Sequence, residues 1–237
     1  MLIAYQNNTL NSNHIKKALE ASTDSAESQF ERRLEAATDG DLQAQLTVAY
    51  NFEKGLGITQ DEAQAAYWYQ QAAAQGSPKG QFMYGRALAY GIGVQLNQTE
   101  GLLWMQKAAE KDYPDATVFT AWAYFKGEGT TQDYKKAAYW YLKGEQHGLK
   151  SAYEPLAWMY MSGEGVEKNE QKGYELYKKA AELGDENAQF NLAVAYDRGV
   201  GVERNMLQAR YWYEKAALQG HNDAHIRLLQ IESFNIE

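Results

Sequence analysis

A Gly-x-Gly motif recurs along this chain at a fixed spacing of 36 residues. Its five copies, with no insertion or deletion between them, are Gly55/Gly57, Gly91/Gly93, Gly127/Gly129, Gly163/Gly165 and Gly199/Gly201. A period of this size is typical of a solenoid, in which each repeat buries its apolar face only against its neighbours. The 237 residues are therefore expected to form one elongated repetitive body.

The first half of each repeat predicts a helix that ends at the motif. In the last copy, Ala188, Leu192, Ala193 and Tyr196 are apolar or small at helical spacing. The Gly-x-Gly motif suits a left-handed C-cap, which glycine adopts without a Cβ penalty. One position of this helix is always small, which lets a second helix approach closely: Ala49, Gly85, Ala121, Ala157 and Ala193.

The second half of each repeat predicts another helix, which begins four residues after the second glycine. Asp and Asn side chains at that point can cap free backbone amides, and the residues there are Asp61, Asn97, Asp133, Asn169 and Asn205. Ala and Trp follow at helical spacing, and we assign the recurring Trp68, Trp104, Trp140 and Trp212 to the core. No segment has a strand pattern, so the expected fold class is all-α.

The period divides the chain into five full repeats with a partial repeat at each end. The full repeats are 40–75, 76–111, 112–147, 148–183 and 184–219. Residues 24–39 align with a second half and residues 220–234 with a first half, so the segments 24–39 and 220–237 are expected to cap the solenoid. Residues 1–23 are expected to form an extension with one loosely docked helix.

The third and fourth repeats depart from the pattern. Gly144-Glu145 replaces an Ala-Ala pair, and Leu176 replaces the tryptophan of the fourth repeat. Pro155 lies in the first turns of a predicted helix, where it is tolerated only if that helix begins near Ser151 or later. We expect looser packing between these two repeats.

Composition narrows the classes of function. The net charge of −8 and the pI near 5.1 argue against nucleic-acid binding, which needs a clustered basic surface. The absence of cysteine excludes disulfides, thiolate zinc sites and a cysteine nucleophile. No signal peptide and no run of transmembrane length are visible. A soluble cytoplasmic protein is expected, or a periplasmic one if an export signal has been removed.

No motif predicts catalysis, a cofactor or a metal. Gly-x-Gly lacks the third glycine and the preceding strand of a dinucleotide site, and it recurs in one structural role. His221 and His225 are four residues apart but have no evident third ligand, so exposed surface is the preferred interpretation. Paired carboxylates such as Asp185-Glu186 begin a helix, where the helix dipole favours negative charge.

The repeat resembles the Sel1-like repeat, a relative of the tetratricopeptide repeat with a longer loop between its helices. The resemblance covers residues 24 to 232, and the last copy shows it in Ala188-Gln-Phe-Asn-Leu-Ala-Val-Ala-Tyr196, Gly199-Val-Gly-Val202, Ala209-Arg-Tyr-Trp-Tyr-Glu-Lys-Ala-Ala217 and Gly220. It implies a right-handed superhelix of helix pairs that binds other proteins. Known members are adaptors in signalling and protein quality control, and some bacterial members are immunity proteins against secreted toxins.

The related tetratricopeptide geometry places the first helix of each pair on the concave face. A binding groove is then expected to contain Tyr50, Phe82, Arg86, Tyr90, Val118, Trp122, Phe125, Lys126, Glu154, Trp158, Met161, Val194, Asp197 and Arg198. Its centre is aromatic, and Trp, Tyr and Arg dominate binding hot spots. The alternative is a tightly curled superhelix in which these side chains pack against the next helix.

These observations predict a non-enzymatic adaptor that holds a protein or peptide in its groove. They do not fix its oligomeric state, for which a monomer is favoured. A narrower alternative is an immunity protein that blocks a toxin, because the chain is small and acidic and many toxins have basic clefts. A third possibility is a solenoid hydrolase, but the resemblance links that activity to cysteine-rich repeats, and this chain has no cysteine.

Overall fold

The protein is described by a computed structural model, which covers residues 26–234 as helices joined by loops. That range contains no strand, which confirms the all-α class. The expected extension at residues 1–23 lies outside the described residues, as do the outer ends of the two expected caps.

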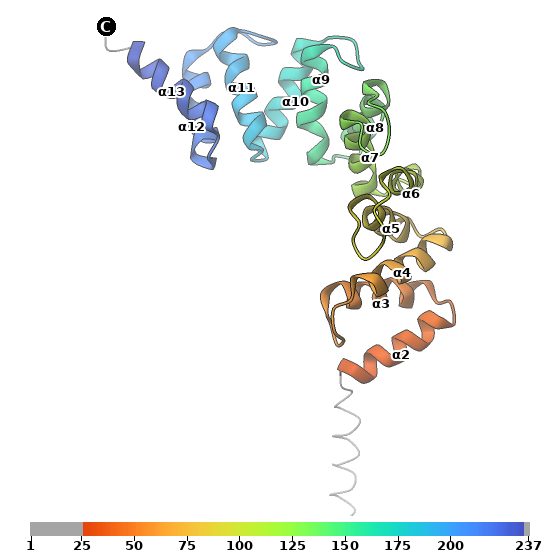
Figure 1. The fold of residues 1–237 in the computed structure, drawn as a ribbon. Coiled ribbons are helices and arrows are strands. Elements are labelled where there is room, and N and C mark those ends of the chain that lie inside the picture. Colours follow the sequence, from red (N-terminus) through yellow and green to blue (C-terminus); the bar gives the residue numbers. More distant parts are fainter. Residues whose placement is uncertain (1–25, 235–237) are drawn as a thin grey trace, which may run out of the picture. The chain divides into compact units, whose positions relative to one another are not determined.

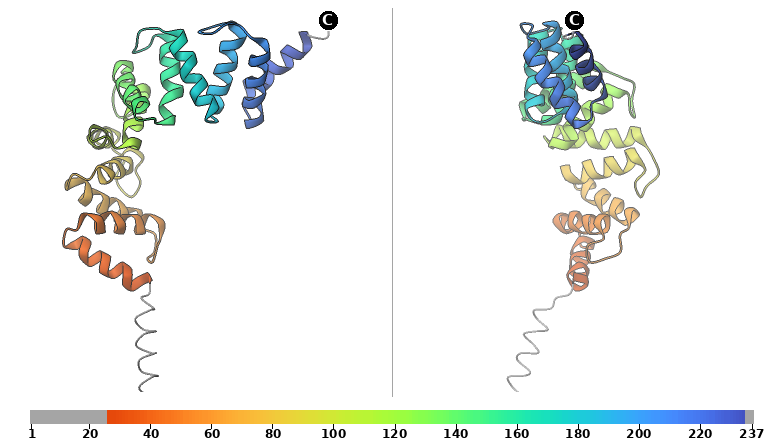
Figure 2. Two further views of the ribbon diagram at one scale, coloured as in Figure 1. Left: turned by 180° about the vertical axis from the view of Figure 1, so that it is seen from behind. Right: turned by 90° about the vertical axis from the view of Figure 1, so that its left-hand side faces the viewer.

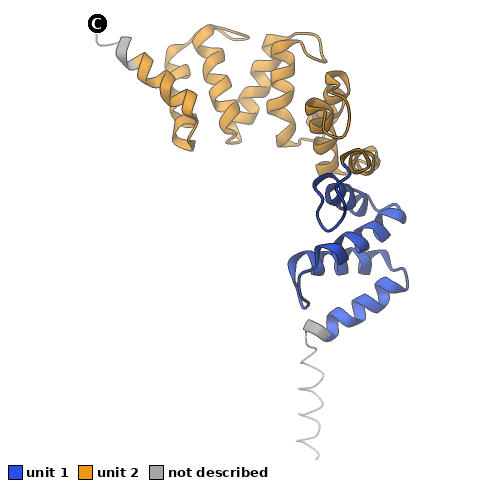
Figure 3. Cartoon of the chain, in the orientation of Figure 1, with its two compact units in different colours: residues 1–97 blue, residues 98–237 orange. Residues whose placement is uncertain are grey.

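The helices belong to two compact units, 1–97 and 98–237, which we describe separately (Figure 3). Unit 1 contains α2 (Ala26–Thr38), α3 (Leu42–Lys54), α4 (Glu62–Ala74) and α5 (Pro78–Tyr90). Unit 2 contains α6 (Gln98–Glu110), α7 (Pro114–Lys126), α8 (Tyr134–Gln146), the 3₁₀ turn η1 (Lys150–Ala152), α9 (Tyr153–Ser162), α10 (Glu170–Glu182), α11 (Glu186–Arg198), α12 (Met206–Gln219) and α13 (Asn222–Phe234). Within each unit, helices that follow one another in the chain pack side by side (Figures 1 and 2).

The capping residues predicted from the sequence lie where the helices begin and end. Each first glycine of the motif is a left-handed C-cap, with φ between 68° and 81°. The N-caps Asp61, Asp133, Asn169 and Asn205 each accept a hydrogen bond from the backbone amide three residues on, at 2.9 to 3.0 Å. The caps fix the boundaries of the helices.

Replacing Asn205 with alanine is expected to destabilise the chain by about 1 kcal/mol, because the amide of Gln208 loses its acceptor. Asn205→Asp keeps an acceptor and should be close to neutral. Urea denaturation followed by circular dichroism measures both. Equal losses for the two variants would contradict the assignment of a capping role to this side chain.

The second glycine of the last four motifs has a different role, which the sequence did not reveal. Its Cα lies against the backbone at the start of the second helix of the preceding repeat. A Cβ at Gly129, Gly165 or Gly201 would overlap the carbonyl group of residue 98, 134 or 170, respectively. The loop that contains this glycine therefore packs directly against the second helix of the previous repeat. This contact links consecutive repeats.

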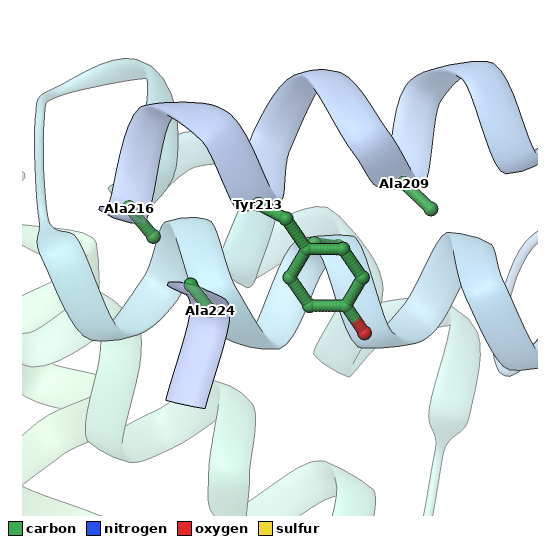
Figure 4. Packing of buried hydrophobic residues seen from close by; sticks show 5 residues of the cluster. Ala209, Tyr213, Ala216 and Ala224 are labelled. Carbon is green, nitrogen blue, oxygen red and sulfur yellow. The ribbon is translucent and has the colours of Figure 1, made fainter. Parts of the chain in front are cut away.

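Small residues and tyrosine form the core between the helices. At the C-terminal end of unit 2, Tyr213 is 2% exposed and lies among Ala209, Ala216 and Ala224 (Figure 4). The recurring tryptophans are less uniform than expected. Trp68 and Trp140 are buried, whereas Trp104 and Trp212 are half-buried.

Two glycines in the irregular third and fourth repeats lie close to neighbouring residues. α9 begins at Tyr153, so Pro155 lies in its first turn, where a helix tolerates proline. A Cβ at Gly144 would lie 3.0 Å from the Ala152 Cβ, so α8 approaches the η1 turn closely. Within the fourth repeat, a Cβ at Gly173 on α10 would meet the Met161 side chain of α9 at 2.8 Å. Each glycine admits a close neighbour, whereas looser packing between the third and fourth repeats as a whole stays a prediction.

Candidate functional site

The predicted groove residues divide between the two units. Tyr50 lies on α3, and Phe82, Arg86 and Tyr90 lie on α5 of unit 1. The others lie on three alternate helices of unit 2: Val118, Trp122, Phe125 and Lys126 on α7, Glu154, Trp158 and Met161 on α9, and Val194, Asp197 and Arg198 on α11.

Four rings from three helices form an aromatic cluster in unit 2: Trp122, Phe125, Tyr134 and Trp158. Phe125 is its centre, stacked on Trp122 at 6.0 Å and edge-on to Trp158 at 5.3 Å between ring centroids. Tyr134 contacts Phe125 at 5.5 Å and Trp158 at 5.9 Å. Tyr134 was not among the predicted residues, although an aromatic residue there is unusual, since the same repeat position elsewhere holds Glu62, Gln98, Glu170 and Met206.

The aromatic cluster is partly covered and partly open to solvent. Trp122 is 38% exposed, whereas Phe125 and Trp158 are half-buried. The Lys126 ammonium lies 4.7 Å from the centre of the Trp122 ring and 5.6 Å from that of Phe125. Such cation–π contacts are weak at exposed sites, so a ligand can displace the lysine. The cluster therefore joins α7 to α8 and α9 and leaves one indole accessible.

The two tryptophans of the aromatic cluster should differ in their contribution to stability. Trp158→Ala is expected to cost about 2 kcal/mol, because its ring contacts two others across helices. Trp122→Ala should cost about 1 kcal/mol or less, because much of its ring already faces water. Urea denaturation of the two variants gives the comparison. A loss for Trp122→Ala as large as that for Trp158→Ala would make Trp122 a core residue.

Glu154 lies one turn before Trp158 on α9 and is half-buried. Its hydrogen-bond partner is the Asn191 side-chain amide, at a long 3.5 Å. Burial, and secondarily the charge of Asp185, raise the pKa of Glu154 from 4.5 to about 7. The pKa values of Tyr141 and Tyr177 are raised mainly by burial and, to a smaller extent, by the negative charge of Glu154. No basic side chain among the described residues forms an ion pair with it.

In unit 1, Arg86 borders a polar cluster around Glu53. The Tyr69 hydroxyl donates to the Glu53 carboxylate at 2.7 Å, and the Arg86 guanidinium lies 3.8 Å from it. Although burial opposes ionisation of Glu53, its hydrogen bonds with Lys54 and Tyr69 and the nearby positive charges hold its pKa below the usual value. These residues line a pocket of about 200 Å³.

Phe82 does not belong to an accessible groove. It is 3% exposed, because Gly80 lets the start of α5 approach the backbone of Ala72 and Ala73 on α4. Its prediction as a partner-binding residue is corrected here to a core position. Tyr50 and Tyr90, by contrast, are 42% and 52% exposed.

Asp197 is likewise part of the interior and is already paired. It is 6% exposed and accepts hydrogen bonds from Arg227 on α13, at 2.7 and 3.0 Å, and from the Tyr213 hydroxyl at 3.3 Å. Asp197 was predicted to contact a partner, but it forms a structural ion pair instead. The neighbouring Arg198 is exposed. Burial, and then Asp197, raise the pKa of Tyr213 to about 12.

His221 has a structural use at the start of α13. Its Nδ1 accepts a hydrogen bond from the Ala224 amide at 3.3 Å, and its ring stacks on Phe190 with centroids 4.3 Å apart. Across residues 26–234, no group of three His, Cys, Asp or Glu side chains is arranged to hold a metal ion. No helix in that range has the length and apolar character needed to span a membrane.

Comparison with known proteins identifies the repeat. The family model described as Sel1 repeat matches residues 42–77, 78–113, 114–149, 152–185 and 187–221. A search of curated protein sequences gives no match.

Solved structures share this architecture. The protein c5321, a protective antigen present in uropathogenic Escherichia coli strains, has an SLR fold; it is 33% identical over 90% of this chain, with a TM-score of 0.82, and this chain spans 45% of its length. A Sel1 repeat protein from Oxalobacter formigenes is 31% identical over 93% of this chain and 86% of its own, with a TM-score of 0.76. Immunity protein Pa5087 from Pseudomonas aeruginosa is 21% identical over 93% of this chain and 81% of its own, with a TM-score of 0.43, a likeness too distant to bear on function.

Proposed function

Because this chain belongs to the Sel1 repeat family, we propose that it is a non-enzymatic protein-interaction module that binds a protein or peptide segment along α7 and α9 of unit 2. The family fold is typical of such modules. The observation that carries the proposal is the aromatic cluster, in which Trp122 remains 38% exposed while its neighbours hold it in place.

The chemistry of the aromatic cluster suits a protein ligand. A tryptophan fixed by neighbouring rings loses little conformational entropy on binding, and tryptophan is enriched in hot spots. Lys126 covers its accessible face with a weak contact that a partner can replace. The net charge of −8 disfavours a nucleic acid and favours a partner with a basic surface.

Affinity capture of the full chain from its native cell, followed by mass spectrometry, tests the proposal. We expect Trp122→Ala to lose the captured partner while the variant remains folded by circular dichroism. Tyr139→Ala is a matched control, because Tyr139 is 60% exposed on α8 and contacts Trp140 instead of the aromatic cluster. Capture that is the same for both variants would place the binding surface elsewhere.

The acidic charge also supports a narrower role as an immunity protein that covers the basic cleft of a toxin. This role and that of an adaptor differ in the stoichiometry of the captured complex. One tight partner in a fixed ratio, whose activity stops on binding, would favour an inhibitor. Several weaker partners would favour an adaptor.

A further inference from the structure

Glu154 occupies a position that the other repeats fill with apolar side chains. The equivalent residues are Leu46, Phe82, Val118 and Phe190. Glu154 also lies in the first turn of α9, where the helix dipole favours a carboxylate. That benefit does not explain its partial burial, because Glu62 and Glu100 also lie in the first turns of their helices and are exposed.

The surroundings of Glu154 leave its negative charge unbalanced. Asp185, at the N-cap of α11, adds a second negative charge. Tyr141 on α8 and Tyr177 on α10 are neutral, and the Tyr141 hydroxyl is buried without a hydrogen-bond partner. The only hydrogen bond that Glu154 accepts within residues 28–231 is the long one from Asn191. A carboxylate partly removed from water normally has a cation or several hydrogen-bond donors as partners.

From this arrangement we infer that Glu154 is the binding site for a cationic side chain of the bound segment. The inference rests on the function proposed above and specifies one chemical feature of the partner. The cation would pair with the carboxylate and gain a second favourable contact from the aromatic cluster, because Trp158 is one turn away on the same face of α9.

Arginine fits this position better than lysine. Its planar guanidinium can donate two parallel hydrogen bonds to one carboxylate, and it stacks on aromatic rings. It is also less strongly hydrated than an ammonium, so it enters a half-buried site more readily. The partner segment is therefore expected to present an arginine beside an apolar residue that contacts Trp122.

A pair of short peptides tests the inference on the full chain. The probes are Ac-Ala-Arg-Ala-NH₂ and the same peptide with citrulline, which has the shape of arginine without its charge. The measurement is the titration of the Glu154 side-chain carboxyl by ¹³C NMR, with the resonance assigned by its absence in Glu154→Gln. The arginine peptide should bind saturably in the millimolar range and lower the titration midpoint by about one pH unit or more. The citrulline peptide should leave it unchanged.

Two results would overturn the inference. One is an arginine peptide that gives no saturable change, or no more change than the citrulline peptide. The other is a Glu154→Gln variant that binds the arginine peptide as tightly as the natural chain does. Either result would leave the proposed function intact if Trp122→Ala still lost the captured partner. The proposed function would fail if Trp122→Ala left capture of the partner unchanged, independently of the peptide results.

Discussion

Replacing Gly201 with alanine is expected to destabilise the folded chain by about 4 kcal/mol. Two costs combine. Gly201 has φ of +71°, where a Cβ is strained, and its Cβ would overlap the backbone carbonyl of Glu170 at the start of α10. Backbone atoms within a helix cannot rotate aside as a side chain can, so the loop after α11 must move away from α10. We expect the loss to include protection of α11 to α13 in amide hydrogen exchange.

Gly148→Ala is the matched control for this prediction. Gly148 has the same φ of +71°, but nothing lies within 4 Å of a Cβ built there. The variant bears the conformational cost alone, about 1 kcal/mol. Urea denaturation of both variants separates the strain from the overlap. Equal destabilisation would show that the loop accommodates a methyl group and that the contact with Glu170 does not link the two repeats.

The comparison of these glycines shows which parts of the fold were predictable. The caps at Gly199 and Asn205 follow from local chemistry, because the residue itself supplies the conformation or the acceptor. The role of Gly201 depends on Glu170, more than thirty residues earlier in the chain. Sequence reasoning assigned both glycines of the motif to one cap, since nothing local distinguishes them. The repeat period predicts each element but not which backbone atoms touch between repeats.

The candidate site was predictable to a similar degree. The row of first-helix residues placed Trp122, Phe125 and Trp158 together, because residues a turn apart on neighbouring helices share a face. Tyr134 was missed because it comes from a second helix, which the concave row omits. Asp197 was misplaced because its partner Arg227 belongs to the terminal half repeat, outside the five full repeats from which the row was built.

Stability should fall by about 3 kcal/mol between pH 4.5 and about pH 8 through the ionisation of Glu154 alone. Its pKa is raised from 4.5 in the unfolded chain to about 7 in the folded chain, so the folded state favours the neutral acid. The neutral acid contributes fully below pH 4.5. That stability is lost as the pH rises towards 7, because the unfolded chain releases the proton first, and the loss is complete above pH 7.

Urea denaturation at both ends of this pH range, for the natural chain and for Glu154→Gln, isolates this contribution. The glutamine variant keeps the shape of the side chain but does not titrate, so it removes the effects of all other carboxylates from the comparison. The natural chain should lose about 3 kcal/mol relative to the variant as the pH rises. If the free energy of unfolding changed with pH in the same way for both proteins, water would solvate the Glu154 carboxylate in the folded chain. A bound arginine would act in the opposite direction, because it favours the carboxylate, so the arginine peptide should stabilise the natural chain at about pH 8 and not Glu154→Gln.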